Sequence, residues 1–301
     1  MSHSHSHSHS HSEGASEKNL IFTMLLNFLI TIAEIIGGIF SGSLSLISDA
    51  LHNFSDGIAI IITYIAMKLG KKPKTLKYTF GLKRAEILAA IINSSTLIVI
   101  SFFLIKEAID KIINPTPITG YLMLIVATIG LIANIAGTLL LKKGAKGSMN
   151  MRAAYLHLFS DAISSLAVII GAIFIIYFQV YWIDPILTIL ISLYILKEAY
   201  SITKEAVEVL MMAAPEGIDA NDIKSEVEAF KGVVNIHHLH LWKLNDNTIH
   251  FEAHIEVKDD LISNLMPLKE EIEELLEHKF GIEHTTIQFE IGDCNQELIV
   301  I

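Results

Sequence analysis

Six long apolar segments constrain the fold of this chain more than any other feature. They cover roughly residues 20–40, 45–67, 86–107, 119–141, 154–178 and 185–209, and each is close to the ~20 residues that cross a bilayer as a helix. Hydrophobic residues make up 52% of the 301 residues, which is more than an ordinary water-soluble domain holds. The pattern predicts a polytopic α-helical membrane protein with six transmembrane helices and the lipid bilayer as its solvent.

Charge is distributed unevenly between the two parts of the chain. From Ala213 onward there are 19 acidic and 6 basic residues, whereas the part before it has a net charge of +3. The acidic tail indicates a separate, water-exposed unit and argues against nucleic acid as a partner. A single cysteine, Cys294, excludes an internal disulfide and a four-cysteine zinc site. No basic region precedes the first apolar segment, so we expect no cleavable signal peptide.

The basic linkers predict how the chain is oriented in the membrane. The linkers after the second and fourth apolar segments are lysine-rich, and the linkers on the other side hold few basic residues. The positive-inside rule then predicts both termini in the cytoplasm. Residues 1–18 begin with a Ser-His alternation from His3 to His11, which predicts a disordered His-rich cytoplasmic arm. The arm is either an expression tag or a native metal-collecting segment, and the alternation favours the second.

The predicted domains are therefore the arm, a six-helix membrane domain over residues 19–212 and a cytoplasmic domain over 213–301. In the last, Asp219 can cap a helix that reaches about Phe230. Alternating patterns predict strands over 234–243, 248–257 and 285–291, with an amphipathic helix over 262–280. The order helix–strand–strand–helix–strand predicts an α/β ferredoxin-like fold that lacks one strand.

Two copies of one short pattern lie within the apolar segments. Residues 51–56 and 156–161 both read L-H-x-F-S-D, so each copy places a His and an Asp one helical turn apart on the same face. An Asp at mid-membrane costs roughly 2.5–3.5 kcal/mol, and no lysine or arginine lies at mid-depth to neutralise it. Two imidazoles and two carboxylates suit a tetrahedral zinc-type site. We therefore predict an intramembrane divalent-metal site formed by His52, Asp56, His157 and Asp161.

Further polar residues are expected around this site. Ser55, Ser160 and Ser164 are candidate hydrogen-bond acceptors for the histidines. Asp49, three residues before His52, is near the same helix face and can lie behind the ligands or on the route of the ion. Asn27 and Glu34 on the first segment and Asn134 on the fourth are further buried polar groups. Interhelical hydrogen bonding is the alternative interpretation for these three residues.

The predicted metal ligands also indicate what drives transport of the ion. Metal binding requires neutral histidines, so binding displaces protons and couples the metal to pH. The sequence has no Walker A motif that would indicate a nucleotide-driven motor. A secondary transporter that exchanges metal for protons is the simplest prediction.

With these residues in place, the chain resembles the cation diffusion facilitator family, in particular its bacterial zinc exporters. The resemblance rests on residues 43–50 leading into His52, on residues 78–86, on His157 with Asp161, and on residues 237–242. It implies six membrane helices, a homodimer, proton-driven efflux and the inner membrane of a bacterium or archaeon. It also implies that the two His-Asp pairs hold the transported ion, with His at position 52 associated with zinc preference.

For the tail, the resemblance implies cytoplasmic zinc ligands at His237, His254 and Glu290, with His284 as an expected addition. Zinc would then be a structural or regulatory ion as well as the substrate. The alternative is a set of surface histidines on an acidic domain. His240, His250 and Gln288 are weaker candidates, and His238 is assigned no role.

Two departures from the family pattern limit the resemblance. The linker between the second and third helices has lysines and no His, so no further metal site is expected there. Met211 and Met212 stand where many members have an acidic residue, which puts in doubt a salt bridge from Arg84 across a dimer.

The predicted function is export of Zn²⁺, and also of Cd²⁺ or Co²⁺, in exchange for protons. A membrane-bound metal sensor or buffer without transport is the main alternative. A membrane metallohydrolase would favour an H-E-x-x-H pattern, which the sequence lacks, so no enzymatic activity is expected.

Overall fold

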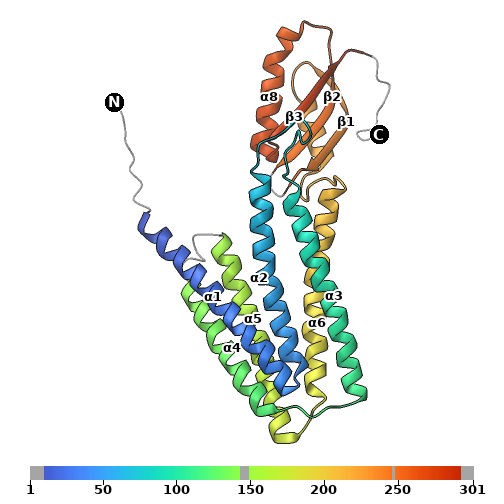
Figure 1. Ribbon diagram of the computed structural model, residues 1–301. Helices are drawn as coiled ribbons and strands as arrows, with labels where there is room; N and C mark the ends of the chain where they lie inside the picture. The colour runs from blue at the N-terminus through green and yellow to red at the C-terminus, as the bar shows by residue number, and fades with distance from the viewer. Residues whose placement is uncertain (1–9, 143–148, 246–247, 293–301) are drawn as a thin grey trace. The chain divides into compact units, whose positions relative to one another are not determined.

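The computed structural model describes residues 10–142, 149–245 and 248–292, which form helices and a small sheet (Figure 1). The elements run in the order α1 (Ser10–Ser41), α2 (Leu44–Gly70), α3 (Ala85–Ile113), α4 (Gly120–Leu141), α5 (Met149–Phe178), α6 (Ile183–Leu210), α7 (Ala220–Glu228), β1 (Val233–Lys243), β2 (Ile249–Val257), α8 (Ile262–Phe280) and β3 (His284–Glu290). The chain divides into two compact units, the first comprising residues 1–62 and 92–201 and the second residues 63–91 and 202–301. The predicted domain boundaries at residues 18 and 212 stay a prediction.

The helices confirm the predicted membrane fold. Five of them, α2 to α6, are long and apolar enough to span a bilayer, and the described apolar part of α1 covers Leu25–Ser41. The prediction of a disordered arm is wrong over residues 10–18, because α1 already begins at Ser10. The apolar helix continues backward through good helix formers such as Ala15 and Glu17. The prediction for residues 1–9 lies outside the described residues.

In the first unit, α4 packs against both α1 and α5, and Figure 1 shows the three helices side by side. Glycines allow the closest approach of α1 to α4. A Cβ atom on Gly37 would lie 2.6 Å from Val126, and one on Gly130 would lie 2.5 Å from Glu34 Oε1. The adjoining core contains Leu46, Met123, Val126, Val168 and Ala172. This core is shared by residues of α2, α4 and α5.

A buried carboxylate joins the start of α6 to the start of α2. Asp184 accepts hydrogen bonds from the Oγ atoms of Ser43 and Ser45 at 2.6 Å, from Leu44 N at 2.8 Å and from Ser45 N at 3.2 Å. It therefore caps the N-terminus of α2, whose first backbone N–H groups have no partner within their own helix. The same turn is bound by Lys111 Nζ, which donates to Gly42 O at 2.6 Å.

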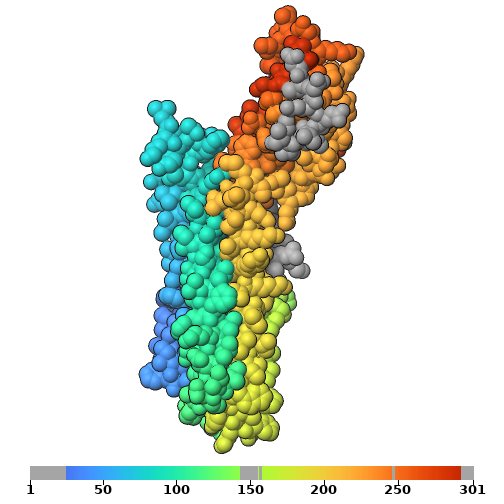
Figure 2. All heavy atoms as spheres, turned by 90° about the vertical axis from the view of Figure 1, so that its right-hand side faces the viewer, coloured from blue at the N-terminus to red at the C-terminus, as the bar shows by residue number. Residues whose placement is uncertain are grey.

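Helices α3 and α6 pack against each other and lie side by side along the face that Figure 2 shows. In the first unit the contact includes Leu97, Ile195 and Ala199. In the second unit it includes Ile87, Ala206 and Val209.

The second unit contains the predicted mixed α/β domain. The sheet order is β1-β2-β3, with β1 antiparallel and β3 parallel to β2. Helix α7 begins after Asp219, whose carboxylate accepts a hydrogen bond from Asn221 N at 2.8 Å, and α8 ends at Gly281 with a φ of 67°. Phe251 and Ile255 of β2 pack with Ile272 of α8 in the buried core. The side chains that alternate with them on the strands lie on the opposite face of the sheet.

Candidate metal centres

The first candidate centre lies within the helices, where α2 and α5 face each other. On α2, His52 Nε2 lies 3.4 Å from Asp56 Oδ2, so this pair shares one helix face as predicted. On α5, Asp161 is only 2% exposed and interacts electrostatically with Asp49 and Asp56 of α2. The structure therefore brings Asp161 toward the α2 pair. The buried Asp49 and Asp161 and the half-buried Asp56 thus bring three acidic residues of two helices into one region, which suits a divalent cation.

The fourth predicted ligand, His157, belongs to α5 one turn before Asp161. Its side chain lies outside the described residues. The helical spacing of four residues still places the Cα positions of His157 and Asp161 on the same face of α5.

The neighbouring polar residues are only partly where the sequence predicts them. Asp49 is buried and its Oδ1 accepts a hydrogen bond from Ser164 Oγ at 2.6 Å, which ties α2 to α5 beside the site. Ser160 lies elsewhere, with its Oγ 3.5 Å from Tyr194 Oη. Asn27 is half-buried on α1, and its backbone carbonyl accepts a hydrogen bond from Thr31 Oγ1 at 2.8 Å. Of these residues, Asp49 has the position expected of a group that supports the ligands.

The second candidate centre lies on the face of the sheet opposite the core that contains α8 residues. Glu290 on β3 bridges two histidines, with Oε2 3.1 Å from His237 Nε2 and Oε1 2.8 Å from His254 Nδ1. Burial raises the pKa of Glu290, but the hydrogen bond from Gln288 and the charges of His254 and His237 outweigh it, so the pKa lies below the usual range. The structure thus brings together His237, His254 and Glu290, which the resemblance had implied as ligands.

A fourth member of this cluster, His238, was not predicted. Its ring stacks on that of His254, with centroids 4.7 Å apart, and the ligand atoms of His237, His238 and His254 all lie within 4.8 Å of one another. Regular alternation would send His238 to the other face, but its φ is +49° and the β1–β2 register shifts between His237 and His240. This β-bulge points both histidines to one side. The sequence does contain a sign of this bulge. The core residues Ile236 and Leu239 are three positions apart, whereas Leu239 and Leu241 keep the two-residue spacing of a regular strand.

His284 lies apart from this cluster, contrary to its predicted grouping with Glu290. It is six residues from Glu290 on β3, roughly 20 Å along an extended strand. It pairs instead with His250 on β2, and the two ring centroids are 4.4 Å apart. His250 also stacks on Trp242 and meets Phe80 edge-on.

The environment of His250 predicts a pH-dependent stability. Burial lowers its pKa, and His284, Lys83 and Lys74 lower it further through their positive charges. The folded pKa is below the unfolded value of ~6.5, so the unfolded state binds more protons in this range and stability decreases as pH falls below ~6.5. Without metal, the urea midpoint of the tail should therefore be lower at about pH 5.5 than at about pH 7.5.

Fluorescence of Trp242 in a Trp182→Phe background measures this transition in the full chain. The variant His250→Phe keeps a ring against Trp242 and should lose part of the pH dependence. An identical pH dependence in both proteins would show that His250 does not cause it.

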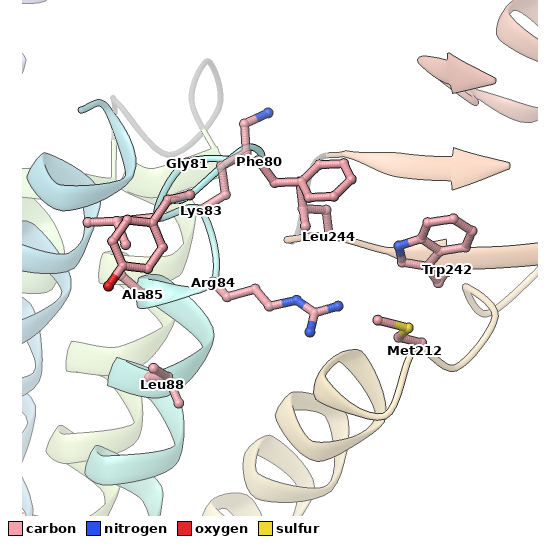
Figure 3. A pocket seen from close by; sticks show the side chains of 11 residues that line it. Phe80, Gly81, Lys83, Arg84, Ala85, Leu88, Met212, Trp242 and Leu244 are labelled. Carbon is pink, nitrogen blue, oxygen red and sulfur yellow. The ribbon is translucent and has the colours of Figure 1, made fainter. Parts of the chain in front are cut away.

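A pocket of about 410 Å³ lies in the second unit, between the α2–α3 loop and β1. Figure 3 shows the Arg84 guanidinium extending toward Met212 and Trp242, with Phe80 and Leu244 beside them. Lys83 Nζ donates a hydrogen bond to Thr248 Oγ1 at 3.4 Å in the same unit. Within the described chain, the Arg84 side chain thus lies near the apolar side chains of Met212 and Trp242.

Comparison with known proteins agrees with this architecture. A model of the cation efflux transmembrane domain matches residues 20–211, and a model of the cytoplasmic domain of cation efflux proteins matches residues 215–291. A "Cadmium, cobalt and zinc/H(+)-K(+) antiporter" of Bacillus subtilis (strain 168) is 39% identical over all of this chain and 96% of its own length.

Two further relatives cover nearly the same span. The "Metal cation efflux system protein CzcD" of Cupriavidus metallidurans is 35% identical over 98% of this chain and 91% of its own length. The "Zinc transporter ZitB" of Escherichia coli (strain K12) is 34% identical over 98% of this chain and 94% of its own length.

Membrane helices with buried acidic residues, joined to a small α/β domain, define a metal-cation efflux transporter. The chain belongs to the cation diffusion facilitator family. The resemblance noted in the sequence is therefore confirmed at the level of the family and of the class of activity.

Proposed function

We propose that this protein exports Zn²⁺, and also Cd²⁺ or Co²⁺, from the cytoplasm in exchange for protons. His52, Asp56, His157 and Asp161 hold the ion in transit, and Asp49 supports them. The observation that carries the proposal is the approach of the buried Asp161 on α5 to the His52–Asp56 pair on α2. The names of three relatives, which mention zinc, cadmium, cobalt or metal cations, support the same substrate class.

The chemistry of the site explains why protons would cross the membrane in the direction opposite to the metal ion. Neutral imidazoles and ionised carboxylates bind a divalent cation, and protonation of the same groups removes the lone pairs that the cation needs. Metal enters from the side where protons are scarce and leaves where they are abundant. A rigid-body movement of the helices around the fixed site would alternate its access between the two sides.

The expected arrangement is a homodimer in an inner membrane, with both termini in the cytoplasm. The basic linkers after α2 and α4 support that orientation. The histidine cluster of the sheet then faces the cytoplasm. Its members His237, His238 and His254 fit a zinc ion by donor type and spacing, and Glu290 contacts two of them. A zinc ion bound there would neutralise part of the acidic tail, and we assign it a structural or regulatory role.

The test of transport is zinc uptake into proteoliposomes with and without an imposed pH gradient. Uptake that requires the gradient supports exchange, and uptake that ignores it contradicts proton coupling. No uptake by a folded protein that still binds zinc would favour a membrane-bound sensor or buffer.

The cluster of His237, His238, His254 and Glu290 on the sheet can be tested separately from transport. His238→Ala should weaken zinc binding by the tail by roughly tenfold or more, because one of three converging imidazoles is lost. His278→Ala, which removes an exposed histidine of α8, is the matched control. Calorimetric titration of the full-length variants with zinc measures the difference. Equal affinity in the two variants would remove His238 from the ligand set.

A further inference from the structure

A fully buried carboxyl on α1 is not used by either metal centre. Glu34 is 0% exposed, and its Oε2 lies 3.5 Å from Asn53 Nδ2 on α2, a long hydrogen bond. Its other oxygen, Oε1, is buried and has no hydrogen-bond partner within the part of the chain that the structure describes. Buried carboxylates are normally paired, so this arrangement calls for an explanation.

The fold makes room for this carboxyl where α1 crosses α4. A Cβ atom on Gly130 would lie 2.5 Å from Glu34 Oε1, and the next atom of the Glu34 carboxyl is 3.6 Å away. Glycine is therefore the residue that allows the carboxyl to lie against the backbone of α4. The site is enclosed by three helices, with α2 on the side of Asn53.

Among the described residues, the charged groups that act on Glu34 are acidic. Asp49 of α2 and Asp161 of α5 interact with it electrostatically, and α4 presents Gly130, which has no charge. Asp49 is itself buried, at 2% exposed. Adding a third negative charge to this buried region costs free energy unless a proton or a metal ion compensates for it.

We propose that Glu34 is a proton-carrying group of the exchange cycle, separate from the four metal ligands. It holds a proton while the α2–α5 site has no metal, and it releases that proton when a divalent cation binds. This inference rests on the proposed function, because it assigns one of the exchanged protons to a specific residue. Glu34 itself binds no metal in this cycle.

The step balances as a simple proton transfer. When the cation binds, the Glu34 O–H bond breaks, the electron pair stays on Oε1, and the proton passes to water. Asn53 Nδ2 donates to the resulting carboxylate through the contact to Oε2. After the metal leaves on the other side, water returns a proton to the same oxygen, which restores the neutral acid.

The test counts protons released as zinc binds, using a pH indicator in weakly buffered solution with the full-length protein. Glu34→Gln keeps the size of the side chain and cannot release a proton. It should release about one proton fewer per transport-site zinc than the wild type and bind zinc about tenfold more weakly, because a proton released on binding contributes to the affinity by linkage. Glu205→Gln, which alters an exposed glutamate of α6, should match the wild type. Zinc bound elsewhere on the chain contributes equally to all three proteins and cancels.

Equal proton release by Glu34→Gln and the wild type would overturn the proposal. Asn53→Ala is a second probe that leaves Glu34 in place. It removes the donor to the carboxylate, so zinc should release the proton only at higher pH, and an unchanged pH profile would also count against the proposal. Asp161→Asn separates this result from the proposed function, because normal zinc binding and release there would refute the α2–α5 site itself.

Discussion

Asp161→Asn should reduce gradient-driven zinc uptake by about 100-fold or more, to the level of empty vesicles. The amide keeps the size of the side chain but removes one negative charge from a residue that is 2% exposed and faces Asp56 and Asp49. A divalent cation held by two imidazoles and one carboxylate is then left with a buried excess of positive charge. Initial rates of zinc uptake into proteoliposomes measure the effect.

Asp110→Asn provides the matched control for that experiment. Asp110 is an exposed acid of α3 that pairs with Lys106 at 3.5 Å, so its loss should leave uptake within about twofold of the wild type. Full uptake by a folded Asp161→Asn protein would show that the ion follows another route.

Asp184→Asn should lower the free energy of unfolding of the protein by a large amount. The carboxylate accepts four hydrogen bonds from the start of α2 and is fully buried. An amide presents two donors there and leaves at least one N–H or O–H group of α2 unsatisfied, at a cost of about 3 kcal/mol. The variant should therefore unfold at a clearly lower temperature in detergent.

Thermal unfolding followed by fluorescence-detected gel filtration measures this loss, with Asp110→Asn as the control again. An unfolding temperature equal to that of the control would contradict the capping role of Asp184. Because Asp184 lies outside the metal centres, zinc affinity of the surviving folded fraction should remain that of the wild type.

Much of the fold could be predicted because its elements follow strong periodic patterns. The helix α8 matches its predicted range of residues 262–280, and the three strands match theirs to within about one residue. The start of α1 was the least predictable boundary. No proline separates the apolar segment from the residues before it, and the helix continues backward to Ser10 past Asn19 and Ser16, which could have capped it.

The candidate sites were predictable only where the ligands repeat along one element. His52 and Asp56 share a helix face by spacing alone, and the tail residues could be placed on strands. Contacts between elements were not predictable in the same way. The position of His238 depends on a bulge, and the enclosure of Glu34 depends on a glycine of another helix.

The pairing of His284 shows the same limit. The parallel register of β2 and β3 sets it opposite His250 and away from Glu290, and the sequence of either strand alone does not fix that register. The capping of α2 by Asp184 joins residues about 140 positions apart in the chain, and no local pattern marks the pair.

Proton-coupled zinc export is tested most directly by measuring zinc and proton movement in the same vesicles. Proteoliposomes that contain one dye for zinc and one for pH receive a zinc pulse, with the wild type and Asp161→Asn compared side by side. Proton-coupled export predicts that zinc entry and proton exit occur together in the wild type and that both are absent from the variant. Zinc entry without proton exit, or movement of both ions in the variant, would contradict it.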